Sequence, residues 1–273
     1  MAGERWPATI RNNSSSRYSV AWMNWQSERA NYALQFRWRT LKLSPVETSE
    51  VFPDMAPKFV SLNDKVYEYI VRSRSRTDDP LLSQLRSETE ARGNIARMLI
   101  SREQGDFLTI LTKALNVRTA VEVGTFTGYS SICIGRGLSA GGRLTCFEIN
   151  EEWAAIAQQY WTKAALRDRL ELQLGNAAQK LTEWQPSEPL DFAFIDADKT
   201  GYDTYFEILL PKMKTNGVFI FDNMLWGGRI VEQPLTDADA IALDNLNRKL
   251  ANDPRVESVL LPIADGLQIV RKK

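Results

Sequence analysis

The stretch "TAVEVGTFTGYSSICIGRGL" at residues 119–138 passes from a short apolar run through a glycine turn into a helical pattern. A strand followed at once by a glycine turn and a helix is typical of a doubly wound α/β sheet. Gly124 and Gly128 suit the turn, because glycine allows tight turning and close approach of a ligand to the backbone. We therefore expect a ligand at the carboxyl end of this strand, where such sheets bind their ligands.

The alternation of strands and helices continues along the chain. The predicted elements after the first unit are, in order, a strand at 142–150, a helix at 151–166, strands at 170–175 and 190–197, a helix at 202–213 and a strand at 217–223. Short apolar strands alternating with helices indicate a mostly parallel sheet that is covered on both faces. The tail at 256–272 is interpreted as an antiparallel hairpin with its turn at Asp265-Gly266. Helical spacing over about 60–115 predicts an N-terminal helical cap.

The overall composition excludes several classes of function. Lys plus Arg and Asp plus Glu both number 34, so the formal charge is zero. Such a chain lacks the broad positive field of non-specific nucleic-acid binding, and we expect no nucleic-acid partner. No run of 18 apolar residues is present, so no transmembrane segment is expected. The absence of histidine, with only two cysteines, excludes His-based triads and tetrahedral zinc sites, so any metal must be bound by oxygen.

Residues 1–50 differ from the rest and are predicted to be a partly flexible, aromatic and basic extension. They contain four of the eight tryptophans, seven Arg or Lys, and four acids. One interpretation is a helix that docks on the body or on a partner subunit. Another is an organelle targeting segment, since the extension is rich in Arg and poor in acids. No secretory signal is visible, so we expect a cytoplasmic location and leave organelle targeting open.

Two acids near the glycine turn indicate the kind of ligand. Glu148 ends the second strand, 26 residues after Glu122, and suits the two hydroxyls of a ribose. Thr125-Phe126 stand where a second glycine would let a pyrophosphate approach, and Glu122 would repel phosphate but suits an amino group. The sequence therefore favours a positively charged adenosine compound without phosphates, such as S-adenosylmethionine.

Three carboxylates and one amide gather at the ends of two neighbouring strands. Asp196 and Asp198 follow one strand, and Asp222 and Asn223 end the next. Carboxylate and amide oxygens are ligands for Mg²⁺, Mn²⁺ or Ca²⁺. In a structural interpretation, Asp198 or Thr200 simply caps the helix that follows at 201–213.

Four segments together resemble the cation-dependent O-methyltransferases of the caffeoyl-CoA and catechol type: "VEVGTFTGYS", "FIDADKTGYDTYF", "FDNMLWGG" and "DPRVESVLLPIADGLQIVRK". The similarity runs from about Phe59 to the C-terminus. It implies that residues 51–273 form a class I, Rossmann-like methyltransferase domain with a seven-stranded sheet. It also implies a homodimer, and methyl transfer from S-adenosylmethionine to a hydroxyl of a small catechol-type, phenylpropanoid or flavonoid-like acceptor.

The resemblance also implies roles for individual residues. The implied contacts to S-adenosylmethionine are Glu122, Gly124, Thr125, Ser130, Glu148, Ala177 and Asp198. The implied ligands of a divalent cation, Mg²⁺ first, are Asp196, Asp222 and Asn223. Lys199 resembles the general base of the family and forms the catalytic pair with Asp196. Lys58 matches a substrate contact, and we interpret Trp226 as a wall of an aromatic pocket.

The chain departs from the plant enzymes at the substrate side. Ile100 stands where they have a threonine, Gly227 where they have an asparagine, and their "HPW" segment is absent. A CoA ester is therefore not specifically indicated. Two other functions stay open: a non-catalytic adenosine-binding module that regulates a partner, and an NAD-dependent oxidoreductase, which the missing phosphate loop disfavours.

Overall fold

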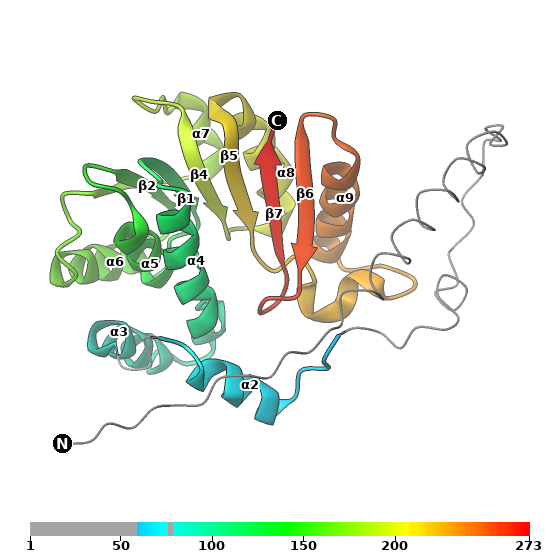
Figure 1. The fold of residues 1–273 in the computed structure, drawn as a ribbon, viewed down its shortest axis with the longest axis horizontal. Helices are drawn as coiled ribbons and strands as arrows, with labels where there is room; N and C mark the ends of the chain where they lie inside the picture. Colours follow the sequence, from blue (N-terminus) through cyan, green and yellow to red (C-terminus); the bar gives the residue numbers. More distant parts are fainter. Residues whose placement is uncertain (1–58, 76–78) are drawn as a thin grey trace, which may run out of the picture. The chain divides into compact units, whose positions relative to one another are not determined.

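A seven-stranded sheet with the order β3-β2-β1-β4-β5-β7-β6 forms the centre of the protein (Figure 1). The computed structural model describes residues 59–75 and 79–273, and residues 61–273 form one compact unit. The strands are β1 Thr119–Val123, β2 Arg143–Glu148, β3 Leu170–Leu174, β4 Leu190–Ile195, β5 Met213–Phe221, β6 Val256–Leu261 and β7 Leu267–Lys272. Strands β1 to β5 pair in parallel, whereas β7 is antiparallel to both β5 and β6. The predicted sheet with its C-terminal antiparallel hairpin is confirmed.

Helices connect the strands and precede the sheet, as predicted. The α-helices are α2 Asp64–Arg72, α3 Pro80–Glu90, α4 Arg102–Ala114, α5 Tyr129–Gly137, α6 Glu151–Lys163, α7 Ala177–Glu183, α8 Tyr202–Leu209 and α9 Ala238–Asn252. The 3-10 helices are η2 Gly93–Met98, η3 Lys199–Gly201, η4 Leu210–Lys212 and η5 Trp226–Val231. None of the described helices has the length and apolar character needed to span a bilayer.

One helix is shorter than the sequence predicts. The expected helix over 202–213 ends as α8 at Leu209 and continues as the 3-10 turn η4. Pro211 lies within η4, and proline lacks the N–H that a continuing α-helix would need. At the start of α3, the side chain of Asp79 accepts a hydrogen bond from Leu82 N and so caps the helix.

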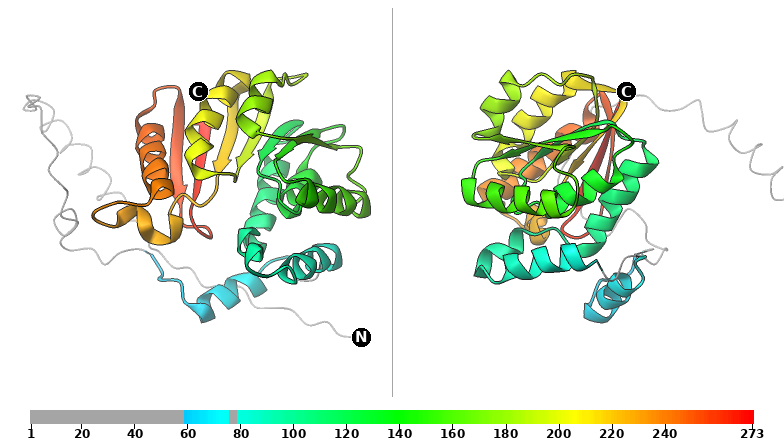
Figure 2. Two further views of the ribbon diagram at one scale, coloured as in Figure 1. Left: turned by 180° about the vertical axis from the view of Figure 1, so that it is seen from behind. Right: turned by 90° about the vertical axis from the view of Figure 1, so that its left-hand side faces the viewer.

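Helices lie on both faces of the sheet, so its central strands are buried. Helices α4, α5 and α6 lie on one face, and α8 and α9 lie on the other, as the reverse view in Figure 2 shows. Successive side chains of β1 point to opposite faces. Ala120 packs with the α5 side, and Val121 and Val123 pack with the α8 and α9 side. Glu122 follows the alternation and lies on the α5 side, fully buried.

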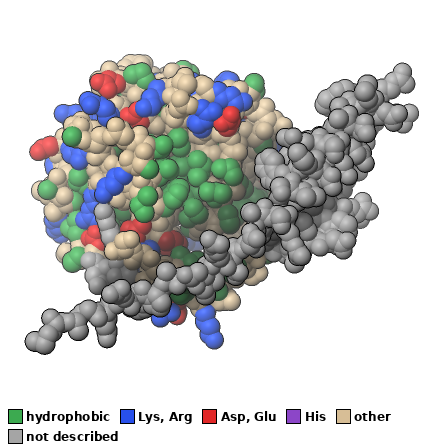
Figure 3. Space-filling view, in the orientation of Figure 1, with side chains coloured by type: hydrophobic (Ala, Val, Ile, Leu, Met, Phe, Trp, Pro, Cys, Tyr) green, Lys and Arg blue, Asp and Glu red, His purple; other side chains and the backbone are tan. Residues whose placement is uncertain are grey.

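The half of the sheet formed by β5, β7 and β6 carries apolar side chains that none of the helices in the described residues covers on the α4 side. Figure 3 shows apolar side chains gathered on this face of the protein. Val259 on β6 is 50% exposed, and its neighbour Ile269 on β7 is half-buried. Sheets of this class usually have both faces covered, so this surface suits a further protein contact.

The predictions for the N-terminal extension lie outside the described residues. This applies to residues 1–50, with their targeting and docking interpretations, and to Lys58. They stay predictions.

We predict that Gly124→Ala destabilises the protein strongly. Gly124 has φ +90°, and a Cβ there would overlap the backbone oxygen of Asp196. The left-handed conformation alone costs alanine about 1–2 kcal/mol, so with the overlap we expect a loss above about 2 kcal/mol in urea unfolding. Gly141→Ala is the matched control, because Gly141 has φ +73° and a Cβ added there would meet nothing within 4 Å. Equal losses in the two variants would contradict the close approach.

Candidate functional site

Backbone hydrogen bonds bring the ends of β1, β4 and β5 together at one edge of the sheet. Asp196 N donates to Val123 O at 2.8 Å, which ties the loop after β4 to β1. Asp222 N donates to Ile195 O at 3.0 Å, which ties the residue after β5 to β4. Parallel strands therefore place Asp196 and Asp222 side by side at their carboxyl ends, where doubly wound sheets bind ligands.

The two carboxylates repel each other in a largely buried setting. Asp222 is 3% exposed, and burial followed by the negative charge of Asp196 raises the pKa of its carboxyl group. The backbone N–H of Asn223 donates to Asp222 Oδ1 at 2.6 Å. Asn223 has φ +58°, a left-handed conformation that asparagine adopts more readily than most residues. The two acids thus lie together, and the amide side chain of Asn223 follows Asp222 directly in the chain, a set of oxygen donors that would suit a cation.

The donor set of this cluster fits a hard divalent cation. Among the described residues, no group of three or more Asp, Glu, Cys or His side chains could hold a metal ion. The predicted set is of another kind, because its third ligand is the amide oxygen of Asn223. Two carboxylates and an amide, with open positions left for water and substrate, match the ligand preference of Mg²⁺.

Lys199 lies next to the acid cluster and is held there by two hydrogen bonds. Its Nζ donates to Asp196 Oδ1 at 2.9 Å and to the hydroxyl of Tyr202 at 2.7 Å. The Tyr202 hydroxyl in turn donates to the backbone oxygen of Asp222 at 3.2 Å. Lys199 Nζ also lies 5.8 Å from the centre of the Trp226 ring. The predicted catalytic lysine is therefore a neighbour of Asp196, of the backbone of Asp222 and of the predicted aromatic wall, Trp226.

Glu122 is a buried acid whose oxygens lack hydrogen-bond partners. It is 0% exposed, and neither side-chain oxygen has a partner of hydrogen-bond geometry. Burial raises the pKa of its carboxyl group to about 8, although the nearby side chains of Ser130, Cys146 and Thr125 lower it. Because an unpaired buried carboxyl is costly, this site suits a ligand that brings its own N–H donors, as the amino group of S-adenosylmethionine would.

Glu148 is held by three backbone N–H groups at the end of β2. Phe126 N donates to Oε2 at 2.7 Å, and Ile149 N and Asn150 N donate to Oε1 at 2.8 Å each. A carboxylate offers about four acceptor positions, so roughly one stays open. Two ribose hydroxyls would have to share that position or displace one of these bonds.

The other residues predicted to bind the cofactor lie on loops and helix starts around the same edge. Thr125 is buried at the end of β1, and Ser130 lies in the first turn of α5. Ala177 is the first residue of α7. Asp198 is exposed and accepts a hydrogen bond from the hydroxyl of Tyr205.

Sequence reasoning missed two residues of this cluster. Tyr202 links Lys199 to the backbone of Asp222, as described above. Gln104 on α4 is 1% exposed and lies near enough to Asp222 to lower the pKa of that carboxyl group. The sequence signal for Gln104 is weak, a polar residue at a buried position of an amphipathic helix.

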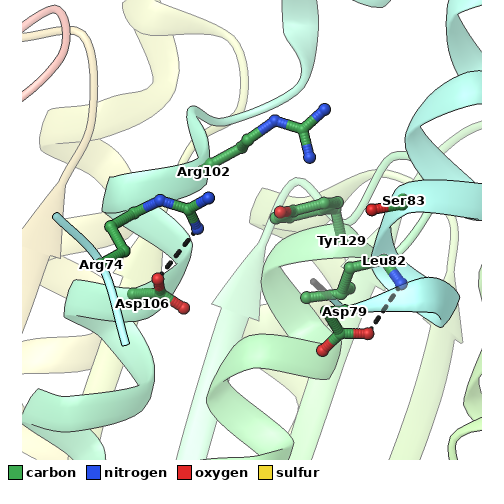
Figure 4. A pocket seen from close by; sticks show the side chains of 7 residues that line it. All are labelled: Arg74, Asp79, Leu82, Ser83, Arg102, Asp106 and Tyr129. Carbon is green, nitrogen blue, oxygen red and sulfur yellow. Dashed lines mark hydrogen bonds and ion pairs between the residues drawn. The ribbon is translucent and has the colours of Figure 1, made fainter. Parts of the chain in front are cut away.

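Two cavities lie near these elements. A cavity of about 240 Å³ between η3 and α9 is lined by Lys199, Thr200, Asp203, Ala242, Asn245, Leu246 and Lys249. The other, in Figure 4, is lined by Arg74, Asp79, Leu82, Ser83, Arg102, Asp106 and Tyr129. Its volume of about 10 Å³ has room for about one water molecule, and it contains none of the predicted site residues. The larger cavity adjoins the predicted catalytic lysine.

The chain is similar to known O-methyltransferases along most of its length. The model of the O-methyltransferase family matches residues 72–273. Caffeoyl-CoA O-methyltransferase 2 of Petunia hybrida is 31% identical over 229 residues, covering 80% of this chain and 95% of the relative. Tapetum-specific methyltransferase 1 of Arabidopsis thaliana is 32% identical over 224 residues, covering 79% and 96%.

A solved structure extends the similarity to three dimensions. The O-methyltransferase from Bacillus cereus in complex with SAH is 32% identical, with a TM-score of 0.71. The match covers 77% of this chain and 97% of that one. The chain thus belongs to the O-methyltransferase family.

Proposed function

We propose that the protein transfers a methyl group from S-adenosylmethionine to one hydroxyl of a small vicinal aromatic diol, with the help of a divalent cation. The observation that carries the proposal is the cluster of Asp196, Asp222 and Asn223 beside Lys199. Relatives named as caffeoyl-CoA O-methyltransferases support an acceptor of the catechol, phenylpropanoid or flavonoid-like kind. Neither the regulatory module nor the oxidoreductase gains support, since the matched family and relatives are methyltransferases.

The methyl donor would lie along the edge formed by β1 and β2. The complex of the Bacillus cereus enzyme with SAH supports a donor of this class. In our proposal the buried Glu122 accepts from the amino group and Glu148 accepts from the ribose, with Ala177 beside the adenine. Ser130 and Asp198 would contact the methionyl end. S-adenosylmethionine supplies the electrophilic methyl carbon.

Asp196, Asp222 and Asn223 would hold the cation, with Mg²⁺ first and Mn²⁺ or Ca²⁺ as alternatives. A bound divalent cation supplies Lewis acidity, which lowers the pKa of a phenolic hydroxyl from about 10. The chain contributes fixed oxygen ligands, since Asp196 and Asp222 are tied to neighbouring strands by their backbone. Three protein ligands leave room for two vicinal hydroxyls, which explains a preference for a diol.

Lys199 is proposed to assist the loss of the proton from the acceptor hydroxyl. Its two hydrogen bonds fix Nζ between Asp196 and Tyr202, within reach of an oxygen that lies beside the acid cluster. As a neutral amine it would accept the proton, and as an ammonium it would stabilise the phenolate charge. Trp226 would pack against the aromatic ring of the acceptor.

We further propose that the protein is a homodimer that buries the exposed apolar half of the sheet. A second copy is the occupant we favour, because the surface is broad, apolar and continuous with the sheet core (Figure 3). The charged pair Arg271–Glu257 on β7 and β6 would form part of its polar rim.

The metal role is tested by chelation and by substitution of the ligands. We expect EDTA to abolish methylation of a catechol acceptor and added Mg²⁺ to restore it. Asp222→Ala and Asn223→Ala should each lower kcat/KM by about 100-fold or more, because the Lewis acid contributes several kcal/mol. Asp168→Ala, an exposed acid away from the site, is the control. Full activity of the two ligand variants would refute the metal role.

Donor binding should release a proton near neutral pH. Glu122 has its pKa raised to about 8, so its carboxyl group is mostly protonated at pH 7. The ammonium of the ligand favours the carboxylate, so the affinity for SAH should rise from pH 6 to pH 8 with release of about one proton.

Calorimetry with SAH in EDTA, in buffers of different ionisation enthalpy, measures this release. Glu122→Gln should bind more weakly and release no proton. Proton release that persists in Glu122→Gln would assign the titration to another group. A calorimetric titration with NAD under the same conditions tests the oxidoreductase alternative, which predicts that NAD binds.

The dimer is tested by light scattering after size exclusion. The wild type should have twice the chain mass of 31.0 kDa, and Val259→Asp should shift it toward the mass of one chain. Ile241→Asp, on the exposed side of α9, is the control and should stay dimeric. A monomeric wild type, or a dimeric Val259→Asp, argues against this interface.

A further inference from the structure

The loop after β5 contains three successive residues in the left-handed conformation. Trp226, Gly227 and Gly228 have φ of +48°, +63° and +84°. Glycine adopts this region readily, whereas a tryptophan is strained there. Such a strained residue persists only where the surrounding structure holds it in place. The position of the Trp226 ring therefore depends on the contacts that hold this loop.

The turn between β6 and β7 holds the loop by three hydrogen bonds. Met224 N donates to Gly266 O at 3.0 Å, and Leu225 N donates to Asp265 O at 2.9 Å. Gly227 N donates to the side-chain Oδ1 of Asp265 at 2.7 Å. The first two bonds need only the backbone of the turn. The third depends on the carboxylate of Asp265, and a hydrogen bond to a carboxylate is stronger than one between neutral groups.

Asp265 thus binds the residue on each side of Trp226. Its backbone oxygen accepts from Leu225, and its carboxylate accepts from Gly227. The turn also packs closely against the loop, since a Cβ added to Gly266 would lie 2.5 Å from Leu225 Cγ. The hairpin turn is therefore a support for the loop that carries the tryptophan.

The ring of Trp226 lies among groups of the proposed acceptor site. It is half-buried, and its centre lies 5.8 Å from Lys199 Nζ. The guanidinium carbon of Arg229 lies 4.8 Å from the same centre. Loss of the bond at Gly227 would free the loop to move and carry the ring away from Lys199.

We propose that Asp265 is a positioning residue of the acceptor site, whose carboxylate fixes Gly227 and so holds the Trp226 ring beside Lys199. The inference rests on the proposed function, in which Trp226 packs against the aromatic ring of the acceptor. Such packing stabilises the bound acceptor and the transition state alike. Its loss therefore raises KM and leaves kcat unchanged.

Steady-state kinetics with caffeic acid as acceptor, S-adenosylmethionine and saturating Mg²⁺ tests this role. We expect Asp265→Ala to raise the KM for caffeic acid about 10-fold, because small displacements of a positioning group are costly. Its kcat and its Kd for SAH should stay within about twofold of the wild type. Asp265→Asn keeps an oxygen that can accept from Gly227 N, so its KM should stay within about twofold of the wild type.

Asp253→Ala is the matched control at the other end of β6. Asp253 Oδ1 accepts from the backbone N–H of Arg255 at 2.9 Å, in the turn before that strand. This variant should lose stability and keep the wild-type KM. If Asp265→Ala does not fold, Asp265→Glu replaces it, since it keeps the charge and displaces the carboxylate by one methylene. Its KM should rise in the same direction.

A double-mutant cycle with Trp226→Ala tests whether Asp265 acts through the tryptophan. Trp226→Ala alone should raise the KM for caffeic acid about 10-fold, through loss of the packing against the acceptor ring. Adding Asp265→Ala to it should change KM by less than about twofold, because two residues that act through one contact are not additive.

The results that would overturn the inference differ in their reach. If Trp226→Ala raises KM but Asp265→Ala does not, or if the two effects add in full, only the role of Asp265 is wrong. If Trp226→Ala keeps the wild-type KM, the proposed aromatic wall is wrong and the role of Asp265 fails with it. Absence of Mg²⁺-dependent methylation in the wild type would contradict the proposed function itself.

Discussion

Two carboxylates held close together at the ends of β4 and β5 impose the main constraint on this protein. Their backbones are fixed by hydrogen bonds to Val123 and Ile195, so Asp196 and Asp222 cannot move apart without breaking the sheet edge. Burial makes the negative charges costly, and the repulsion raises the pKa of Asp222. Such an arrangement favours a positive charge between the acids, which Lys199 supplies in part and a divalent cation would supply fully.

The same edge couples the proposed metal site to the proposed donor site. The backbone of Gly124 passes so close to the oxygen of Asp196 that no side chain fits between them. The loop that would bind the methyl donor and the loop that carries the metal ligand thus form one wall. A donor and an acceptor bound next to each other along this wall would have their relative positions fixed by the backbone itself.

Much of the fold was predictable from the sequence because it depends on local patterns. Apolar strands that alternate with helices predict the parallel sheet, and the turn at Asp265-Gly266 predicts the antiparallel hairpin. The acids that follow β4 and β5 could be predicted to lie close together, because parallel strands end at the same edge of a sheet.

Other features depend on contacts between distant segments, which no local pattern reveals. Gln104, which lowers the pKa of Asp222, lies on a helix that precedes the sheet. The three backbone N–H groups on Glu148 depend on the exact path of two loops. The helix α8 is short because Pro211 ends it. The helical spacing of the residues around Pro211 led to the prediction of a longer helix. The cavity beside Lys199 could not be predicted, because α9, far along the chain, forms one of its walls.

Anomalous diffraction from crystals grown with Mn²⁺ and SAH tests the shared metal site most directly. We expect one anomalous peak at a distance of about 2.0–2.6 Å from oxygens of Asp196, Asp222 and Asn223 together. A peak at another set of residues, or none near these three side chains at saturating Mn²⁺, would contradict the shared site.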